Sequence, residues 1–166
     1  MRSFFSWAHS LVYVVQGARA FRKHDYDGVI EHYSRAIEIS PEDLDYYYMR
    51  GGAYWRRRQY GLAVADFTKV IELNPDDAYA FYARGVINRK RGFLAYALMD
   101  SSQAIVLDPE YTAALCLRAE CYLEKKETGK ALADLEEVLK IDPTHPKASR
   151  LKKHCESLLE NGDADK

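Results

Sequence analysis

Net charge is nearly absent from this chain of 166 residues, in which 24 lysines and arginines face 25 aspartates and glutamates for a formal net charge of −1. A balanced chain has no overall electrostatic attraction to nucleic acid or to an anionic membrane surface. Its proportions of charged residues (30%) and apolar residues (48%) are ordinary for a soluble protein. We therefore expect a soluble chain without a nucleic-acid partner.

Cysteine is scarce, and the three cysteines, Cys116, Cys121 and Cys155, show no CxxC spacing. An odd number of cysteines without a disulfide framework indicates free thiols in a reducing compartment. We expect these side chains to act as small hydrophobic residues, and we expect a cytoplasmic protein.

Motifs that carry catalysis or hold cofactors are missing as well. The chain has no glycine-rich phosphate loop, and its five histidines are scattered without an HExxH motif or a Cys/His ligand spacing. Serine, histidine and acidic residues occur, but no nucleophile motif holds them together. The sequence therefore predicts no enzyme, no metal, no cofactor and no small-molecule substrate.

Acidic residues are absent before Asp25, and the segment between Arg2 and Arg19 holds neither acidic residues nor lysine or arginine. It is somewhat short for a membrane-spanning helix, which needs about 20 apolar residues. The basic start and the sequence ARA at 18–20 faintly suggest a secretory signal, and the lack of acids is also typical of mitochondrial presequences. A mitochondrial location therefore stays open as the alternative.

Our main interpretation of this region is a first helix preceded by a short apolar extension, residues 1–9. The extension contains Phe4, Phe5 and Trp7. Such large apolar side chains are expected to pack on the following residues or to bind a partner, which could be a second copy of the chain or a membrane surface.

Proline is also rare, but four of the five prolines stand at a constant spacing of 34 residues: Pro41, Pro75, Pro109 and Pro143. A period of this length is typical of repeat proteins. With the proline at place 32 of each unit, the units are 10–43, 44–77, 78–111 and 112–145. A remainder of 21 residues, 146–166, follows.

Each unit contains two helical patterns, for example residues 44–57 and 61–74 in the second unit. Apolar residues of the second pattern recur at the i, i+3, i+4 spacing of one helical face, and nothing alternates strictly enough for strands. The proline ends the second helix, because the residue before a proline is disfavoured in the α conformation. The sequence thus predicts an all-α fold of four helix pairs.

Small residues recur where the two helices of a pair would cross. Place 8, in the first helix, holds Gly17, Gly51, Gly85 and Ala119. Place 20, in the second helix, holds Val29, Ala63, Ala97 and Ala131. Glycine costs a helix about 1 kcal/mol relative to alanine, so three glycines in register indicate close helix packing.

These positions resemble the tetratricopeptide repeat family, whose pattern is W-x₂-L-G-x₂-Y, then A-x₃-F, then P, at a 34-residue period. The second unit is the most similar, with Tyr47, Gly51, Tyr54, Ala63 and Phe67 before Pro75, whereas the third has Asn88 and Ser101 where aromatic residues are usual. The resemblance, over 10–145, implies an α-solenoid of four helix-turn-helix repeats. Residues 146–160 then form a capping helix and 161–166 a flexible tail.

One departure from the family pattern recurs at place 7, where the usual leucine is replaced by Gln16, Arg50, Arg84 and Arg118. We expect this place to be half exposed, with the aliphatic stems of the arginines lying on apolar surface.

The resemblance also implies a concave groove lined by one stripe of the first helices, and hence a peptide or protein partner. In this sequence the stripe is aromatic at its centre, basic along one rim and acidic at its C-terminal end. The predicted groove residues are Tyr48, Met49, Trp55, Arg56, Tyr79, Tyr82, Val86, Arg89, Lys90 and Cys116. Tyrosine and tryptophan are enriched at binding hot spots, and the basic rim favours an acidic ligand.

The carboxylate clamp by which co-chaperones of this family grip chaperone tails is absent, because place 5 holds no lysine and place 9 no asparagine: Val14, Tyr48, Tyr82 and Cys116, then Ala18, Gly52, Val86 and Glu120. We therefore expect a non-catalytic interaction module with a different ligand. Two alternatives stay open. The chain could be a constitutive subunit of a larger assembly, docked by its N-terminus or its convex face, or a regulatory or targeting domain of a longer enzyme.

Overall fold

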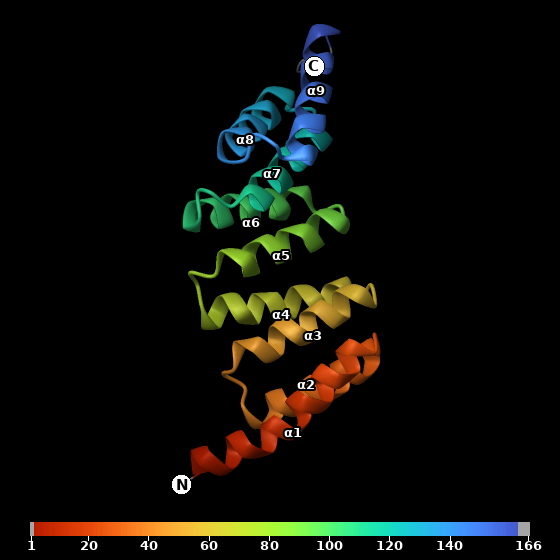
Figure 1. Cartoon of the computed structure of the whole chain (residues 1–166), viewed down its shortest axis with the longest axis vertical. Helices are drawn as coiled ribbons and strands as arrows, with labels where there is room; N and C mark the ends of the chain where they lie inside the picture. The colour runs from red at the N-terminus through yellow and green to blue at the C-terminus, as the bar shows by residue number, and fades with distance from the viewer. Residues whose placement is uncertain (1, 163–166) are drawn as a thin grey trace. The chain divides into compact units, whose positions relative to one another are not determined.

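The structure is a computed structural model that describes the backbone of residues 2–162 and the side chains of residues 10–162. Within these residues every regular element is a helix, as Figure 1 shows. The helices are α1 (Arg2–Arg22), α2 (Tyr26–Ile39), α3 (Leu44–Arg56), α4 (Tyr60–Leu73), α5 (Ala78–Lys90), α6 (Leu94–Leu107), α7 (Thr112–Glu124), α8 (Thr128–Ile141) and α9 (Pro146–Glu160). The predicted all-α architecture of four helix pairs and a final helix is confirmed.

The regularly spaced prolines stand just beyond the second helix of each pair. Helix α2 ends at Ile39, two residues before Pro41, and helix α8 ends at Ile141, two residues before Pro143. The residue between the helix end and the proline, Ser40 or Asp142, adopts an extended or nearly extended backbone, as expected before a proline.

The turn inside each pair also repeats. Its residue at place 15 has a positive φ in all four units: 58° at His24, 58° at Arg58, 80° at Gly92 and 63° at Lys126. Only the third unit uses glycine, the residue that adopts this left-handed conformation without steric cost.

The chain divides into two compact units, one that ends at Ala80 and one that begins at Phe81. The first has a core around Val29, Tyr33, Ala36 and Ala53 and a second cluster of Tyr47, Val70 and Ala80. The core of the second unit includes Leu115, Ala131, Leu135, Val138 and Cys155, with a further cluster of Ala97, Leu117 and Cys121. Each compact unit therefore has core clusters of its own.

Close helix approach at the small residues is confirmed for the glycines of place 8. A Cβ atom added to Gly17 would lie 2.6 Å from the ring of Tyr33, and one added to Gly85 would lie 3.1 Å from the Cβ atom of Asp100. The facing alanines Ala63 and Ala97 are fully buried. Small side chains thus set the distance between the helices of a pair.

The backbone of the apolar N-terminal segment is part of helix α1, which begins at Arg2. The side chains of Phe4, Phe5 and Trp7 lie outside the described residues, so their packing stays a prediction. Among the described residues, no helix combines the length and apolar character that a membrane crossing requires.

Candidate functional site

Tyr48, on α3, is the centre of an aromatic cluster in the first unit. Its ring centroid lies 5.6 Å from that of Tyr79 and 5.9 Å from that of Phe67, and its hydroxyl donates a hydrogen bond to the carboxylate of Asp77. Burial raises the pKa of Tyr48, and the hydrogen bond to Asp77 adds to this rise. Tyr48 is therefore a neutral, half-buried side chain whose hydroxyl is bound to Asp77.

A pocket of about 430 Å³ lies beside this cluster, between helices α1 and α3. Its lining is mainly apolar and aromatic and includes two carboxylates: Ser10, Leu11, Val14, Tyr33, Asp43, Asp45, Tyr46, Tyr48 and Met49. The hydroxyl of Tyr46 donates to Oγ of Ser10 over 3.2 Å, which links α3 to α1 at the pocket. Of the predicted groove residues, Tyr48 and Met49 thus lie together.

The other predicted residues of the first unit differ in exposure. Tyr79 is 55% exposed next to Tyr48, and Arg56 is exposed at the end of α3. Trp55 is half buried, with its ring centroid 5.1 Å from that of Tyr60. Tyr79 therefore offers the largest accessible aromatic surface among the predicted tyrosines of this unit.

In the second unit, Tyr82 and Val86 are half buried and Lys90 is exposed. The ring centroid of Tyr82 lies 5.2 Å from that of Tyr111. Cys116 is only 2% exposed and belongs to the core, so it presents almost no surface to a ligand.

The predicted basic rim is revised at Arg89. Its guanidinium lies 2.7 Å from an oxygen of Glu120 and 2.6 Å from an oxygen of Glu124. Glu120 also pairs with Lys147 on the final helix, over 2.8 Å. Because the chain itself neutralises Arg89, this residue does not supply an uncompensated positive charge to an acidic ligand.

A set of arginine–aspartate pairs was missed by the sequence reasoning, although the arginines at place 7 were singled out. Each arginine donates hydrogen bonds to both carboxylate oxygens of the aspartate that lies 16 residues later in the same repeat. The pairs are Arg50 with Asp66, Arg84 with Asp100 and Arg118 with Asp134. The aspartates are buried and the arginine side chains are 19–23% exposed, so these arginines are partly exposed as predicted, whereas Gln16 at the same place is exposed. The constant separation of 16 residues between arginine and aspartate was the signal in the sequence that could have predicted these pairs.

These pairs have further hydrogen bonds that join successive repeats. Arg50 donates to Ser34 over 3.0 Å, and Arg118 donates to Ser102 over 3.3 Å. Burial raises the pKa of Asp66 while the Arg50 guanidinium opposes that shift. A buried carboxylate is stable only when it is paired and hydrogen-bonded, so these contacts are structural.

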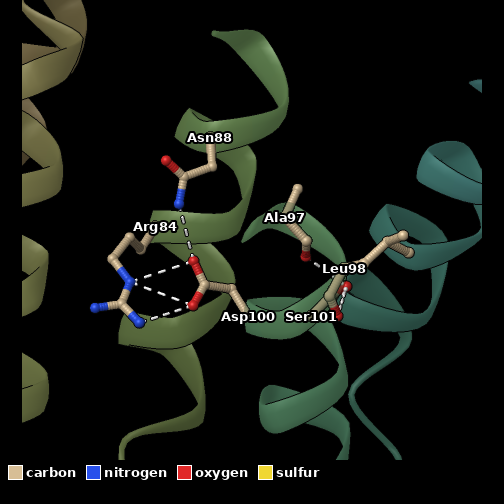
Figure 2. A network of polar contacts seen from close by, with 6 residues as sticks. All are labelled: Arg84, Asn88, Ala97, Leu98, Asp100 and Ser101. Atoms are coloured by element: carbon tan, nitrogen blue, oxygen red, sulfur yellow. Dashed lines mark hydrogen bonds and ion pairs between the residues drawn. The ribbon is translucent and has the colours of Figure 1, made fainter. Parts of the chain in front are cut away.

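The third repeat has two polar residues, Asn88 and Ser101, at places where aromatic residues are usual, and Figure 2 shows their contacts. The side-chain amide of Asn88 donates to Asp100 over 3.1 Å, next to the bonds from Arg84. The hydroxyl of Ser101 donates to the carbonyl of Ala97 over 2.8 Å. Both polar side chains are therefore satisfied within the α5 and α6 helices.

Two of the buried free cysteines, Cys116 and Cys121, lie in the fourth repeat. Burial raises the pKa of Cys116 and raises that of Cys121 to about 11, which keeps both thiols protonated near neutral pH. Among the described residues, no group of three histidine, cysteine, aspartate or glutamate side chains is arranged to hold a metal ion.

Comparison with protein families identifies the repeats. A model described as TPR repeat matches residues 19–57, and a model described as tetratricopeptide repeat matches 44–77 and 112–145, the second and fourth units of the sequence. Together these matches span more than half of the chain. A search of curated proteins found no match.

Solved structures with the same fold include MamA, at a TM-score of 0.85 and 22% identity over 94% of this chain and 84% of that one. YrrB, described as a TPR protein with an unusual peptide-binding site, has a TM-score of 0.79 and 26% identity over 87% and 74%. The TPR2B domain of yeast Sti1, in a complex with pHsp70, has a TM-score of 0.65 and 22% identity over 69% and 96%. The chain therefore belongs to the tetratricopeptide repeat family, whose repeats build modules for protein–protein interaction.

Proposed function

We propose that this protein is a non-catalytic adaptor that binds an extended or helical segment of a partner protein on the first helices of its repeats. The observation that carries this proposal is the pocket between α1 and α3, with Tyr48 and Met49 in its wall. Ligand sites are typically concave and largely apolar, with a few polar groups that orient the ligand, and this pocket has that composition.

The pocket also favours a chemical class of ligand. Its apolar and aromatic walls suit an aliphatic or aromatic side chain of the partner as the anchor. The two carboxylates of the lining, Asp43 and Asp45, favour a neighbouring lysine or arginine of that partner, whereas Arg89 is already paired with Glu120. We therefore propose an apolar segment with a basic flank, in place of the acidic ligand expected from the sequence.

Binding should be tested with peptides selected on the folded full-length chain from a random peptide library. Tyr79→Ala removes a ring that is 55% exposed beside Tyr48, and Met49→Ala removes part of the pocket wall. Each variant is expected to weaken the selected peptides by about 1–4 kcal/mol, the range of hot-spot truncations. Fluorescence anisotropy measures the affinities, and circular dichroism confirms that the variants fold.

A matched control is Tyr96→Ala, which removes an equally large ring that is 59% exposed on the second helix α6. This variant is expected to bind the peptides like the unchanged protein. Asp45→Asn should weaken peptides with a basic flank and reduce the salt dependence of their binding. Full affinity in both the Tyr79→Ala and Met49→Ala variants would overturn the proposal.

A further inference from the structure

Helix α6, the second helix of the third repeat, exposes a stripe of mainly apolar side chains. Tyr96 is 59% exposed, Met99 64% and Val106 72%, and Phe93, at the start of the helix, is 45% exposed. The fifth member of the stripe is the polar residue Gln103, which is also exposed. Large contiguous apolar surface on a monomer is uncommon and marks a site of interaction.

The corresponding places of the other second helices are mostly polar or small, and several of them are charged. In the first repeat they hold Asp25, Gly28, Glu31, Arg35 and Glu38. In the second repeat they hold Gln59, Leu62, Ala65, Lys69 and Glu72, and in the fourth repeat Glu127, Lys130, Ala133, Glu137 and Lys140. Within α6 the one charged residue is Asp100, which is buried and bound to Arg84. The packing of the repeat therefore does not require this apolar stripe, since the other units do without it.

The spacing of the stripe matches a helix-pairing seam. Tyr96, Met99, Gln103 and Val106 follow one another at intervals of three, four and three residues, which is the a/d pattern of a coiled coil. In an antiparallel pair of such helices, a positions of one helix lie level with d positions of the other. Two copies of α6 would then place Tyr96 level with Val106 of the second copy, and Met99 level with Gln103.

The charges at the ends of α6 select the antiparallel direction. Exposed Lys90 and Arg91 precede the helix, and exposed Asp108 and Glu110 follow it. In the antiparallel pair Arg91 of one copy comes next to Glu110 of the other, on both sides of a two-fold axis. A parallel pair would bring like charges together, at an energetic cost.

We propose that the α6 stripe is a self-association surface through which two copies of this chain pair antiparallel around a two-fold axis. One face of a helix about 21 Å long buries less than the roughly 800 Å² per partner of a standard interface. The pairing is accordingly weak, with a dissociation constant in the micromolar range, and it involves none of the residues that line the pocket between α1 and α3.

Sedimentation analysis of the full chain from about 1 µM to about 300 µM tests this pairing, because that range brackets a micromolar equilibrium. The expected result is a concentration-dependent monomer–dimer equilibrium. Met99→Glu, which places a charge in the middle of the stripe, is expected to raise the dissociation constant at least tenfold. A matched control is Val15→Glu, at a 58% exposed position of α1, which is expected to leave the dimer unchanged.

A charge exchange tests the direction of the pair. Arg91→Glu alone should weaken the dimer, because it would face Glu110 of the second copy, and adding Glu110→Arg should restore part of the lost affinity. Both positions are exposed, so circular dichroism is expected to stay unchanged. A chain that remains monomeric over the whole range, or a dimer that Val15→Glu abolishes and Met99→Glu does not, would overturn the proposal.

Discussion

Single side chains set the distance between the two helices of a repeat. At Gly17 a methyl group would have to displace the ring of Tyr33, whose side chain is almost fully buried, because the added Cβ atom would lie 2.6 Å from it. At Gly52, also inside a helix, nothing lies within 4 Å of an added Cβ atom. Two glycines of helical conformation therefore have opposite roles, one required by packing and one not.

At the residue scale we predict opposite effects of alanine at these glycines. Gly17→Ala should lower the free energy of unfolding by about 1–3 kcal/mol through overpacking against Tyr33. Gly52→Ala should raise it by about 0.5–1 kcal/mol, since alanine favours the helix and meets no neighbour. Urea denaturation followed by circular dichroism measures both, and equal effects of the two substitutions would contradict the packing at Gly17.

At the scale of the element, the turn between the two helices has the same backbone conformation in all four repeats, but the residue in that conformation differs. The first, second and fourth repeats have His24, Arg58 and Lys126 in the left-handed conformation, and the third repeat has Gly92 there. A side chain in this conformation costs about 1 kcal/mol or more per residue, so three of the four turns carry a small strain.

For these turns we predict that Gly92→Ala lowers the free energy of unfolding by about 1 kcal/mol, because alanine is strained at a φ of 80°. Gly129→Ala provides a matched control. An added Cβ atom meets no neighbour at either glycine, but Gly129 lies in the first turn of helix α8 and its φ is not positive. There alanine should instead stabilise the protein by about 0.5–1 kcal/mol. Thermal denaturation of both variants is the measurement, and stabilisation by both would show that the left-handed turn at Gly92 is absent.

At the scale of the whole molecule, the arginine–aspartate pairs distribute stability along the chain. Each compact unit has its own core clusters, and each holds at least one such pair, Arg50 with Asp66 in the first and Arg118 with Asp134 in the second. In repeat proteins each unit contributes its own stability and interacts with its neighbours only. The loss of one arginine–aspartate pair should therefore destabilise mainly the compact unit that contains it.

We predict that Asp134→Ala lowers the stability of the second unit by about 2–3 kcal/mol, because the half-buried Arg118 loses its partner. Both tryptophans, Trp7 and Trp55, precede Ala80, so tryptophan fluorescence reports on the first unit while circular dichroism reports on all helices. In urea the circular-dichroism midpoint should fall more than the fluorescence midpoint. Asp66→Ala is the control and should lower the fluorescence midpoint instead.

Coincident midpoints in the Asp134→Ala variant would show that the chain unfolds as one cooperative body, against the expectation for separate contributions.

The sequence by itself determined the helices of this protein and their pairing. Period and periodicity are local properties, so the spacing of Pro41 and its equivalents and the small residues at places 8 and 20 were enough to predict four helix pairs. The aromatic residues of the candidate groove could be named in the same way, because places on one helical face are fixed by geometry.

Only the tertiary structure decided which of these side chains are available and what they contact. Cys116 shares the stripe of Tyr48 and Tyr82 in sequence, yet it is buried, because how far neighbouring helices cover a side chain depends on how they pack. The sequence suggests that Arg89 is an unpaired basic group, but in the structure it is bound to Glu120, 31 residues later. Contacts between helices depend on packing distances of a few ångström, which the order of residue types along one chain does not specify.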